Sequence, residues 1–114
     1  MADTLEIQKL DGSRAGQRVL RLIGSLSLQT VPDFLKVARA ETSPVMIVEF
    51  AGVTIVDSAG VGALLQTVAS MNKTQRRLGL CCVGQRTISV LEITRVISLF
   101  QVFPTLAEAE EKLI

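Results

Sequence analysis

The sequence predicts a single α/β domain with a largely parallel sheet and an antiparallel hairpin at its N-terminal edge. Short apolar runs suited to buried strands alternate with segments whose apolar residues recur every three or four positions, as on one face of a helix. Such alternation is typical of parallel sheets covered by helices. A chain of 114 residues is long enough to bury one core. The predicted order is ββαβαβαβα, with about four helices.

The first half of the chain contains three predicted strands and one helix. Apolar and polar residues alternate over 5–8, and the turn Asp11-Gly12 returns the chain antiparallel into a strand over 18–23. Small and polar residues over 24–27 are expected to end that strand. A helix then opens near Pro32, because proline suits a first turn, and the next strand covers 45–50.

The second half alternates helices with short strands. After a connection over 51–56, the apolar spacing from Val61 to Met71 predicts a helix over about 58–73. A strand over 78–83 and a helix near Thr87 follow. A short strand over 100–103 precedes the last helix, whose start carries the capping-box pair Thr105 and Glu108.

Composition excludes several classes of function. Twelve basic and eleven acidic residues leave a net charge of +1, which does not favour nucleic acid or a membrane surface. Without Tyr or Trp, the chain lacks the stacking platforms of single-strand binders. No apolar run approaches the ~20 residues of a membrane span, and the N-terminus lacks the features of a secretory signal. We expect a cytoplasmic protein with no direct nucleic-acid contact and no membrane span.

The absence of histidine removes Ser-His-Asp catalysis, Cys-His catalysis and histidine-based metal sites. The two cysteines, Cys81 and Cys82, are adjacent. On a strand they would point to opposite faces, which is poor geometry for a disulfide or a metal site. They are expected to be small, buried, reduced residues, and no metal or cofactor is predicted.

Asp57 and Ser58 form the candidate functional site, since they lie between a buried strand and a helix. Three interpretations compete. One of the two residues is only a helix N-cap. Alternatively, Ser58 is a nucleophile, but the pattern Gly-x-Ser-x-Gly is absent, with Val56 at its first position, and no base is evident. In the third, Ser58 is phosphorylated. The added charge, about −1.5 to −2, would be tolerated by the helix start, opposed by Asp57 and repelled by a docked partner.

Small residues surround the start of this helix. Gly60 and Gly62, with Ala59 and Ala63, leave it nearly bare of side chains. Each glycine is unfavourable there by roughly 0.5–1 kcal/mol relative to alanine. Either a partner approaches this helix closely, or the helix packs tightly on its own sheet.

The stretch 53–65, Val-Thr-Ile-Val-Asp-Ser-Ala-Gly-Val-Gly-Ala-Leu-Leu, resembles the signature of STAS domains. Weaker similarities lie at 24–27 (Gly-Ser-Leu-Ser), at 90–94 (Val-Leu-Glu-Ile-Thr) and at 107–109 (Ala-Glu-Ala). The resemblance implies a STAS (SpoIIAA-like) fold over the whole chain, 1–114. It also implies the function of an anti-sigma factor antagonist.

In such families the serine that matches Ser58 is phosphorylated by a partner that is both anti-sigma factor and ATP-dependent serine kinase. The unphosphorylated antagonist binds this partner and frees the sigma factor. The phosphorylated form does not bind until a PP2C-type phosphatase resets it. The resemblance therefore implies a bacterial switch protein that regulates transcription and is not itself an enzyme.

The resemblance also implies a partner-binding surface around the phosphoacceptor. Often the family has Gly-Glu-Leu-Asp after the second strand, whereas this chain has serines in place of both acids, which would lower the negative charge beside the site. The predicted surface comprises Thr54, Asp57, Ser58, Ala59, Gly60, Val61 and Gly62, with Ser25 and Ser27.

Two other functions remain as alternatives. One is a STAS subunit of a larger assembly, such as a stress-signalling complex or a lipid-transport ABC system, in which Ser58 is never phosphorylated. The other is a nucleotide-binding or hydrolytic domain, but the chain lacks Gly-x-x-x-x-Gly-Lys and an acid pair suited to Mg²⁺. The basic residues Lys73, Arg76 and Arg77 either touch a partner or form a solvated face.

Overall fold

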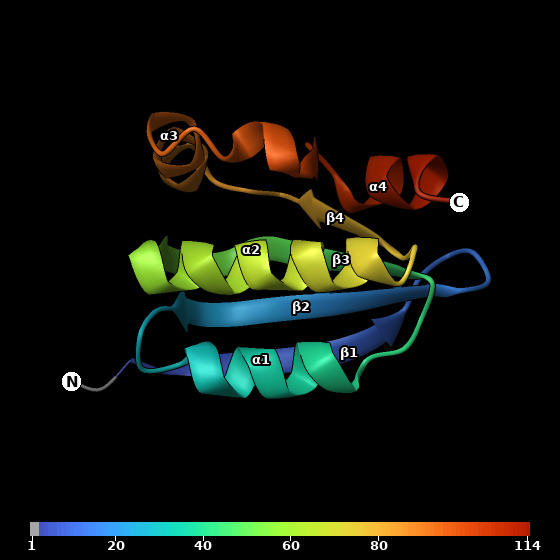
Figure 1. Ribbon diagram of the computed structural model, residues 1–114, viewed down its shortest axis with the longest axis horizontal. Helices are drawn as coiled ribbons and strands as arrows, with labels where there is room; N and C mark the ends of the chain where they lie inside the picture. The colour runs from blue at the N-terminus through green and yellow to red at the C-terminus, as the bar shows by residue number, and fades with distance from the viewer. Residues whose placement is uncertain (1–2) are drawn as a thin grey trace.

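The computed structural model describes residues 3–114, which form a five-stranded mixed sheet with helices on both faces (Figure 1). The strands lie in the order β1-β2-β3-β4-β5; β1 is antiparallel to β2, and the other pairs are parallel. The predicted α/β class, the hairpin and the parallel sheet are confirmed. The elements are β1 Leu5–Asp11, β2 Gln17–Leu26, α1 Val31–Ala40, β3 Val45–Val56, α2 Ser58–Lys73, β4 Arg77–Cys81, α3 Gln85–Ile93, the 3-10 helix η1 Ile97–Leu99, β5 Gln101–Phe103 and α4 Leu106–Lys112.

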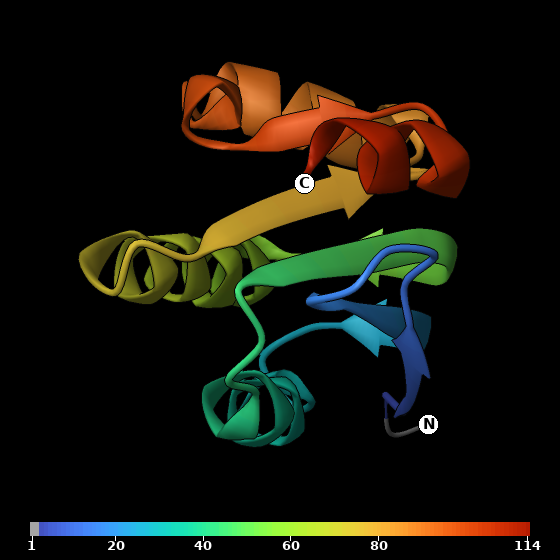
Figure 2. The ribbon, with the colours of Figure 1, turned by 90° about the vertical axis from the view of Figure 1, so that its right-hand side faces the viewer.

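Two apolar cores lie on opposite faces of the sheet, because successive strand side chains alternate. The larger core packs α1, α2 and α3 on β2, β3 and β4, with Phe34, Leu64 and Leu91 among the buried helix residues. The smaller core packs Ala109 and Leu113 of α4 against the other face. Figure 2 shows α1 and α2 on one side of the sheet and α4 on the other.

Helix α2 begins and ends at the predicted residues. Asp57 caps its start, and the side chains of one face are buried at the spacing that predicted it. Helix α4 also begins as predicted, where the N–H of Glu108 donates to Thr105 Oγ1 at 3.1 Å. The buried residues of α2 are Gly60, Val61, Ala63, Leu64, Thr67, Val68 and Met71.

Strands β2 and β3 are longer than the sequence predicts. The expected break at 24–27 and the expected connection at 51–56 are wrong, because the two strands stay paired as far as Leu26 and Val56. Register shifts between Arg21 and Ile23 and between Gly24 and Ser25 absorb the irregular sequence. The backbone of Gly24 has φ 120°, which a residue with a Cβ rarely adopts.

The other differences are local. Helix α1 ends at Ala40 rather than near residue 43, and β4 ends at Cys81 rather than at residue 83. The short helix Ile97–Leu99 was not predicted, since three residues carry too little periodicity to detect.

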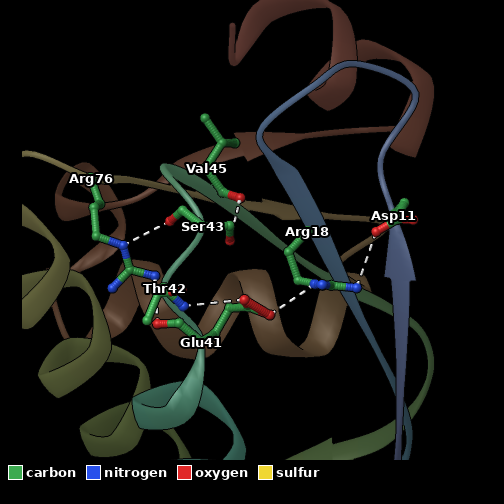
Figure 3. Close-up of polar contacts among 7 residues, drawn as sticks. All are labelled: Asp11, Arg18, Glu41, Thr42, Ser43, Val45 and Arg76. Atoms are coloured by element: carbon green, nitrogen blue, oxygen red, sulfur yellow. Dashed lines mark hydrogen bonds and ion pairs between the residues drawn. The ribbon is translucent and has the colours of Figure 1, made fainter.

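A polar network holds the connection between α1 and β3, at the amino end of β3 (Figure 3). Arg18 forms ion pairs with Asp11 at 3.1 Å and with Glu41 at 2.8 Å. Arg76 donates from Nε to the Ser43 carbonyl at 2.7 Å and from Nη2 to the Glu41 carbonyl at 2.9 Å. Arg76 thus supplies hydrogen-bond donors to two backbone carbonyl groups in the connection that follows α1.

Of the three basic residues at the end of α2, only Arg76 is held in the α1–β3 connection. Arg76 is half-buried on the α1–β3 connection, and Arg77 donates to the Ile114 carbonyl at 3.0 Å. Lys73, in the last turn of α2, and Arg77 are both exposed and fit the solvated face that was one of the two interpretations.

Candidate functional site

The site lies where the carboxyl ends of β2 and β3 meet. Leu26 and Val56 are paired in register as the last residues of their strands. The turn over 27–30 leads from one strand into α1, and Asp57 leads from the other into α2. Because the strands are parallel neighbours, the two turns lie side by side. The N–H of Asp57 donates to the Leu26 carbonyl at 3.2 Å and joins them.

Asp57 ties the two turns together with its side chain. Its Oδ1 accepts the N–H of Gly60 at 2.9 Å, which caps α2, and its Oδ2 accepts the N–H of Leu28 at 3.1 Å. Both carboxylate oxygens are therefore engaged by backbone donors, and the residue is half-buried. The N-cap interpretation is confirmed for Asp57, which orders the site rather than acting as a free base.

Ser58 is the first residue of α2, and its side chain is exposed. Its hydroxyl lies at the positive end of the helix dipole, near backbone N–H groups without helical partners. Within residues 3–114, no side chain that could act as a base is hydrogen-bonded to this hydroxyl. The site therefore lacks the neighbouring base that activates a catalytic serine nucleophile.

The two glycines of α2 have different causes. A Cβ on Gly60 would lie 2.3 Å from the Leu26 carbonyl oxygen and 2.9 Å from Val56 Cγ1. Gly60 therefore permits α2 to pack on its own sheet. A Cβ on Gly62 would meet nothing within 4 Å, so internal packing does not explain the second glycine.

Ser25 and Thr54 join β2 and β3 near their ends. Their hydroxyl oxygens are 3.2 Å apart, and Thr54 Oγ1 also donates to the Gly24 carbonyl at 3.3 Å. The side chain of Thr54 is exposed and that of Ser25 is half-buried. Both predicted residues therefore lie near the carboxyl ends of β2 and β3, at the end of the sheet where Asp57 and Ser58 follow β3.

Ser27 does not lie on the surface as predicted. It is 3% exposed, and its hydroxyl donates to Asp3 Oδ2 at 2.7 Å. Its N–H donates to Thr30 Oγ1 at 2.9 Å, and its carbonyl accepts the N–H of Thr30 at 2.9 Å, which holds the turn before α1. Asp3 brings one carboxylate to this turn, in which Ser25 and Ser27 stand where the family often has acids.

The accessible surface therefore differs from the predicted one: some predicted residues are buried, and one exposed residue was not predicted. The side chain of Val61 is 6% exposed and belongs to the core, and Gly60 is buried with it. Leu28, which the sequence analysis missed, is 68% exposed and bonded to Asp57 through its N–H. The sequence feature that could have indicated Leu28 is a large apolar residue within a polar turn. We call the accessible set the switch surface: Ser25, Leu28, Thr54, Asp57, Ser58, Ala59 and Gly62.

The two cysteines do not point to opposite faces. Strand β4 ends at Cys81, and the backbone of Cys82 has φ 59°, in the left-handed region. Their sulfur atoms and a carboxylate oxygen of Glu49 all lie within 4.8 Å of one another. Both thiols are free, and Cys82 is half-buried, whereas the sequence analysis expected both residues to be buried. Burial raises the pKa of the Cys81 thiol above its usual range, and Cys82 and Glu49 add to the rise.

None of the helices in residues 3–114 is both long enough and apolar enough to span a bilayer. No curated protein matches the sequence.

Solved structures share the fold over nearly the whole chain. An anti-sigma factor antagonist from Mycobacterium paratuberculosis matches with a TM-score of 0.86 and 20% identity, over 96% of this chain and 94% of that chain. The Bacillus cell fate determinant SpoIIAA in its phosphorylated form matches with a TM-score of 0.73 and 18% identity, over 96% of this chain and 100% of that chain. A sulfate transporter family protein from Wolinella succinogenes matches with a TM-score of 0.76 and 25% identity, over 86% and 84%. The family model of the STAS domain matches residues 5–109, and the chain belongs to the STAS domain family.

Proposed function

We propose that this STAS domain is an anti-sigma factor antagonist that is switched off by phosphorylation of Ser58. The observation that carries the proposal is the exposed Ser58 hydroxyl at the first position of α2, next to an aspartate whose two oxygens are already engaged. The likeness of the fold to anti-sigma factor antagonists, one of them in a phosphorylated form, supports it.

In this proposal the unphosphorylated domain binds, through the switch surface, an anti-sigma factor that is also a serine kinase, and so releases a sigma factor. The kinase transfers the γ-phosphoryl group of ATP to Ser58 Oγ, leaving ADP, and takes up the hydroxyl proton. The kinase must supply the base, since the described residues place none at Ser58. A PP2C-type phosphatase hydrolyses the phosphoserine to serine and inorganic phosphate. The domain itself catalyses neither step.

Charge explains why such a modification would act on binding more than on folding. The phosphate adds about −1.5 to −2 charges. The helix start favours them by about 0.3–1 kcal/mol, and the neighbouring Asp57 carboxylate opposes them. Residues 58–61, the first turn of α2, hold no acidic side chain that would add to the repulsion. A partner docked on the switch surface would have to desolvate the phosphate or be repelled by it.

The test is phosphorylation by each serine kinase/anti-sigma factor of the source organism, with ATP, read by intact mass and by fragment mapping. We expect one phosphate on wild type and none on Ser58→Ala. Ser25→Ala is the matched control, since Ser25 lies on the same switch surface, and it should accept one phosphate like wild type. A phosphate that persists on Ser58→Ala, or maps to another serine, would contradict the assignment.

A second candidate is compatible with the likeness to the sulfate transporter family protein. The domain could instead be a constitutive subunit of a larger assembly, such as a stress-signalling complex or a lipid-transport ABC system. The switch surface would then stay docked, and Ser58 would carry no phosphate in protein purified from its native host. Substituting Ser58 with alanine or aspartate would show whether charge at this position matters to assembly.

A further inference from the structure

A cluster of metal-ligating atoms lies away from the serine site. One carboxylate oxygen of Glu49 and the sulfur atoms of Cys81 and Cys82 lie within 4.8 Å of one another. Glu49 of β3 is paired in register with Cys81 of β4, so the sheet itself brings the carboxylate beside the first thiol. The second thiol arrives because the chain turns as it leaves β4.

The turn at Cys82 is unusual for a residue with a side chain. Its φ of 59° lies in the left-handed region, which only a few per cent of such residues adopt. Its N–H donates to the Phe103 carbonyl at 3.2 Å, which fastens this backbone to β5. Strained backbone of this kind often marks a functional site. Here its effect is to bring two adjacent thiols together.

The three groups are largely withdrawn from water. Cys81 is 0% exposed, Glu49 is 8% exposed and Cys82 is half-buried. Arg21 Nε donates to Glu49 Oε1 at 2.7 Å. Within residues 3–114, no group donates a hydrogen bond to the second oxygen, Oε2. The carboxylate therefore retains one oxygen for another ligand.

We propose that Glu49, Cys81 and Cys82 bind one thiophilic divalent cation, of which Zn²⁺ and Cd²⁺ are the representative probes. Thiolates select such ions, and a carboxylate is a common third ligand. Binding releases the two thiol protons to solvent, since only thiolates coordinate. Three protein ligands leave the fourth tetrahedral position to water.

Charge balance is consistent with this occupant. A divalent cation with two thiolates and one carboxylate carries a net charge of −1, which the adjacent Arg21 guanidinium offsets; the Glu110 carboxylate, whose charge also acts on Cys81, further favours a bound cation. Without a cation, the same residues form the Arg21–Glu49 ion pair beside two free thiols. The proposal does not depend on the function of Ser58.

The test uses the full chain, stripped with a chelator and kept reduced by a phosphine. Cd²⁺ is titrated while the ultraviolet thiolate-to-metal charge-transfer band is recorded, and native mass spectrometry counts ions per chain. Zn²⁺ is then measured by competition against a chromophoric chelator. We expect one ion per chain and a band of the intensity given by two thiolates.

Three variants test the ligands. Cys82→Ser should halve the band and weaken binding by more than ~100-fold, beyond the ~10–100-fold loss when a ligand merely loses its hydrogen-bond partner. Glu49→Gln should keep the band and weaken binding by at least ~10-fold. Glu41→Gln is the matched control, because Glu41 also forms an ion pair with an arginine, Arg18, but lies outside the cluster. The Glu41→Gln variant should bind the cation like wild type.

Several results would overturn the proposal. These are wild-type affinity in Cys82→Ser or Glu49→Gln, a single-thiolate band in wild type, or one ion shared by two chains. Failure of the reduced wild type to bind Cd²⁺ would leave only an ion pair and two thiols. Cys82 lies outside the strand and is half-buried, so Cys82→Ser decides the matter even if Glu49→Gln folds poorly.

Discussion

One added methyl group at Gly60 tests whether the start of α2 packs closely on the ends of β2 and β3. In Gly60→Ala the new Cβ would lie 2.3 Å from the Leu26 carbonyl oxygen and 2.9 Å from Val56 Cγ1. The first of these atoms is backbone, at the end of β2, and cannot move by a side-chain rotation. Either α2 must shift from the sheet or the paired ends of β2 and β3 must move.

The size of the effect follows from two opposing terms. Overpacking of a well-packed site is unfavourable by about 1–3 kcal/mol, and a backbone clash belongs at the upper end of that range. Replacing a helical glycine with alanine gains about 1 kcal/mol. The net change for Gly60→Ala is a loss of about 2 kcal/mol. Gly62→Ala is the matched control, because its Cβ meets nothing within 4 Å, and it should gain about 0.5–1 kcal/mol.

Urea denaturation, followed by far-ultraviolet circular dichroism, measures both free energies of unfolding. A loss of about 2 kcal/mol corresponds to a fall in Tm of roughly 8 °C for a domain of this size. If Gly60→Ala is as stable as wild type, the close packing of α2 on the end of β2 is wrong. If Gly62→Ala is less stable than wild type, the inference that Gly62 faces open space is wrong.

Three further predictions concern the site and the buried thiol. Asp57→Ala should lower the free energy of unfolding by about 2 kcal/mol in urea denaturation, because it removes the α2 cap and the acceptor for the Leu28 N–H; an unchanged midpoint would refute this. Leu28→Ala should leave that free energy within about 0.5 kcal/mol of wild type, since the side chain is 68% exposed, while weakening binding to the anti-sigma partner in calorimetry; the reverse pattern would place Leu28 in the core. The pKa of the Cys81 thiol in the folded chain is raised above its usual 9.0. Above pH 9.0 the folded chain therefore keeps a proton that the unfolded chain releases. The contribution of this thiol to the free energy of unfolding is fully present below pH 9.0 and is lost as the pH rises above it. In chelator and reductant the loss should approach ~1.4 kcal/mol per pH unit, and a Cys81→Ala variant should lack the contribution of this thiol.

The helix of the site could be predicted from sequence because its signals are local. Val61, Leu64 and Met71 define a face by their spacing, and Asp57 is a strong N-cap residue, so the bounds of α2 agree with the prediction. The Thr105 cap of α4 follows from the same kind of signal. Such patterns need no knowledge of the neighbouring elements.

The ends of β2 and β3 could not be predicted because their signals are not local. Gly24 and the polar residues around it read as a break, but each strand extends because the other is there to pair with it. The hydrogen bond from Ser27 to Asp3 likewise joins residues that are distant in sequence. Pairing partners of this kind appear only in the folded chain.

The cysteine cluster escaped the sequence analysis for a related reason. Two adjacent residues lie on opposite faces only while the strand continues. Strand β4 ends at Cys81, and Cys82 turns with a left-handed backbone that is seldom expected of a residue other than glycine or asparagine. The proximity to Glu49 comes from the register of β3 with β4.

The central claim is that charge at Ser58 controls docking, and affinity for the anti-sigma factor kinase tests it most directly. Calorimetry would compare wild type, Ser58→Ala and Ser58→Asp, with the phosphate content of each sample read by intact mass. We expect tight binding by wild type and Ser58→Ala, and a loss of at least ~10-fold in the affinity of Ser58→Asp, equivalent to about 1.4 kcal/mol. Equal binding by all three, with no phosphate on native protein, would contradict the switch and favour a constitutive subunit.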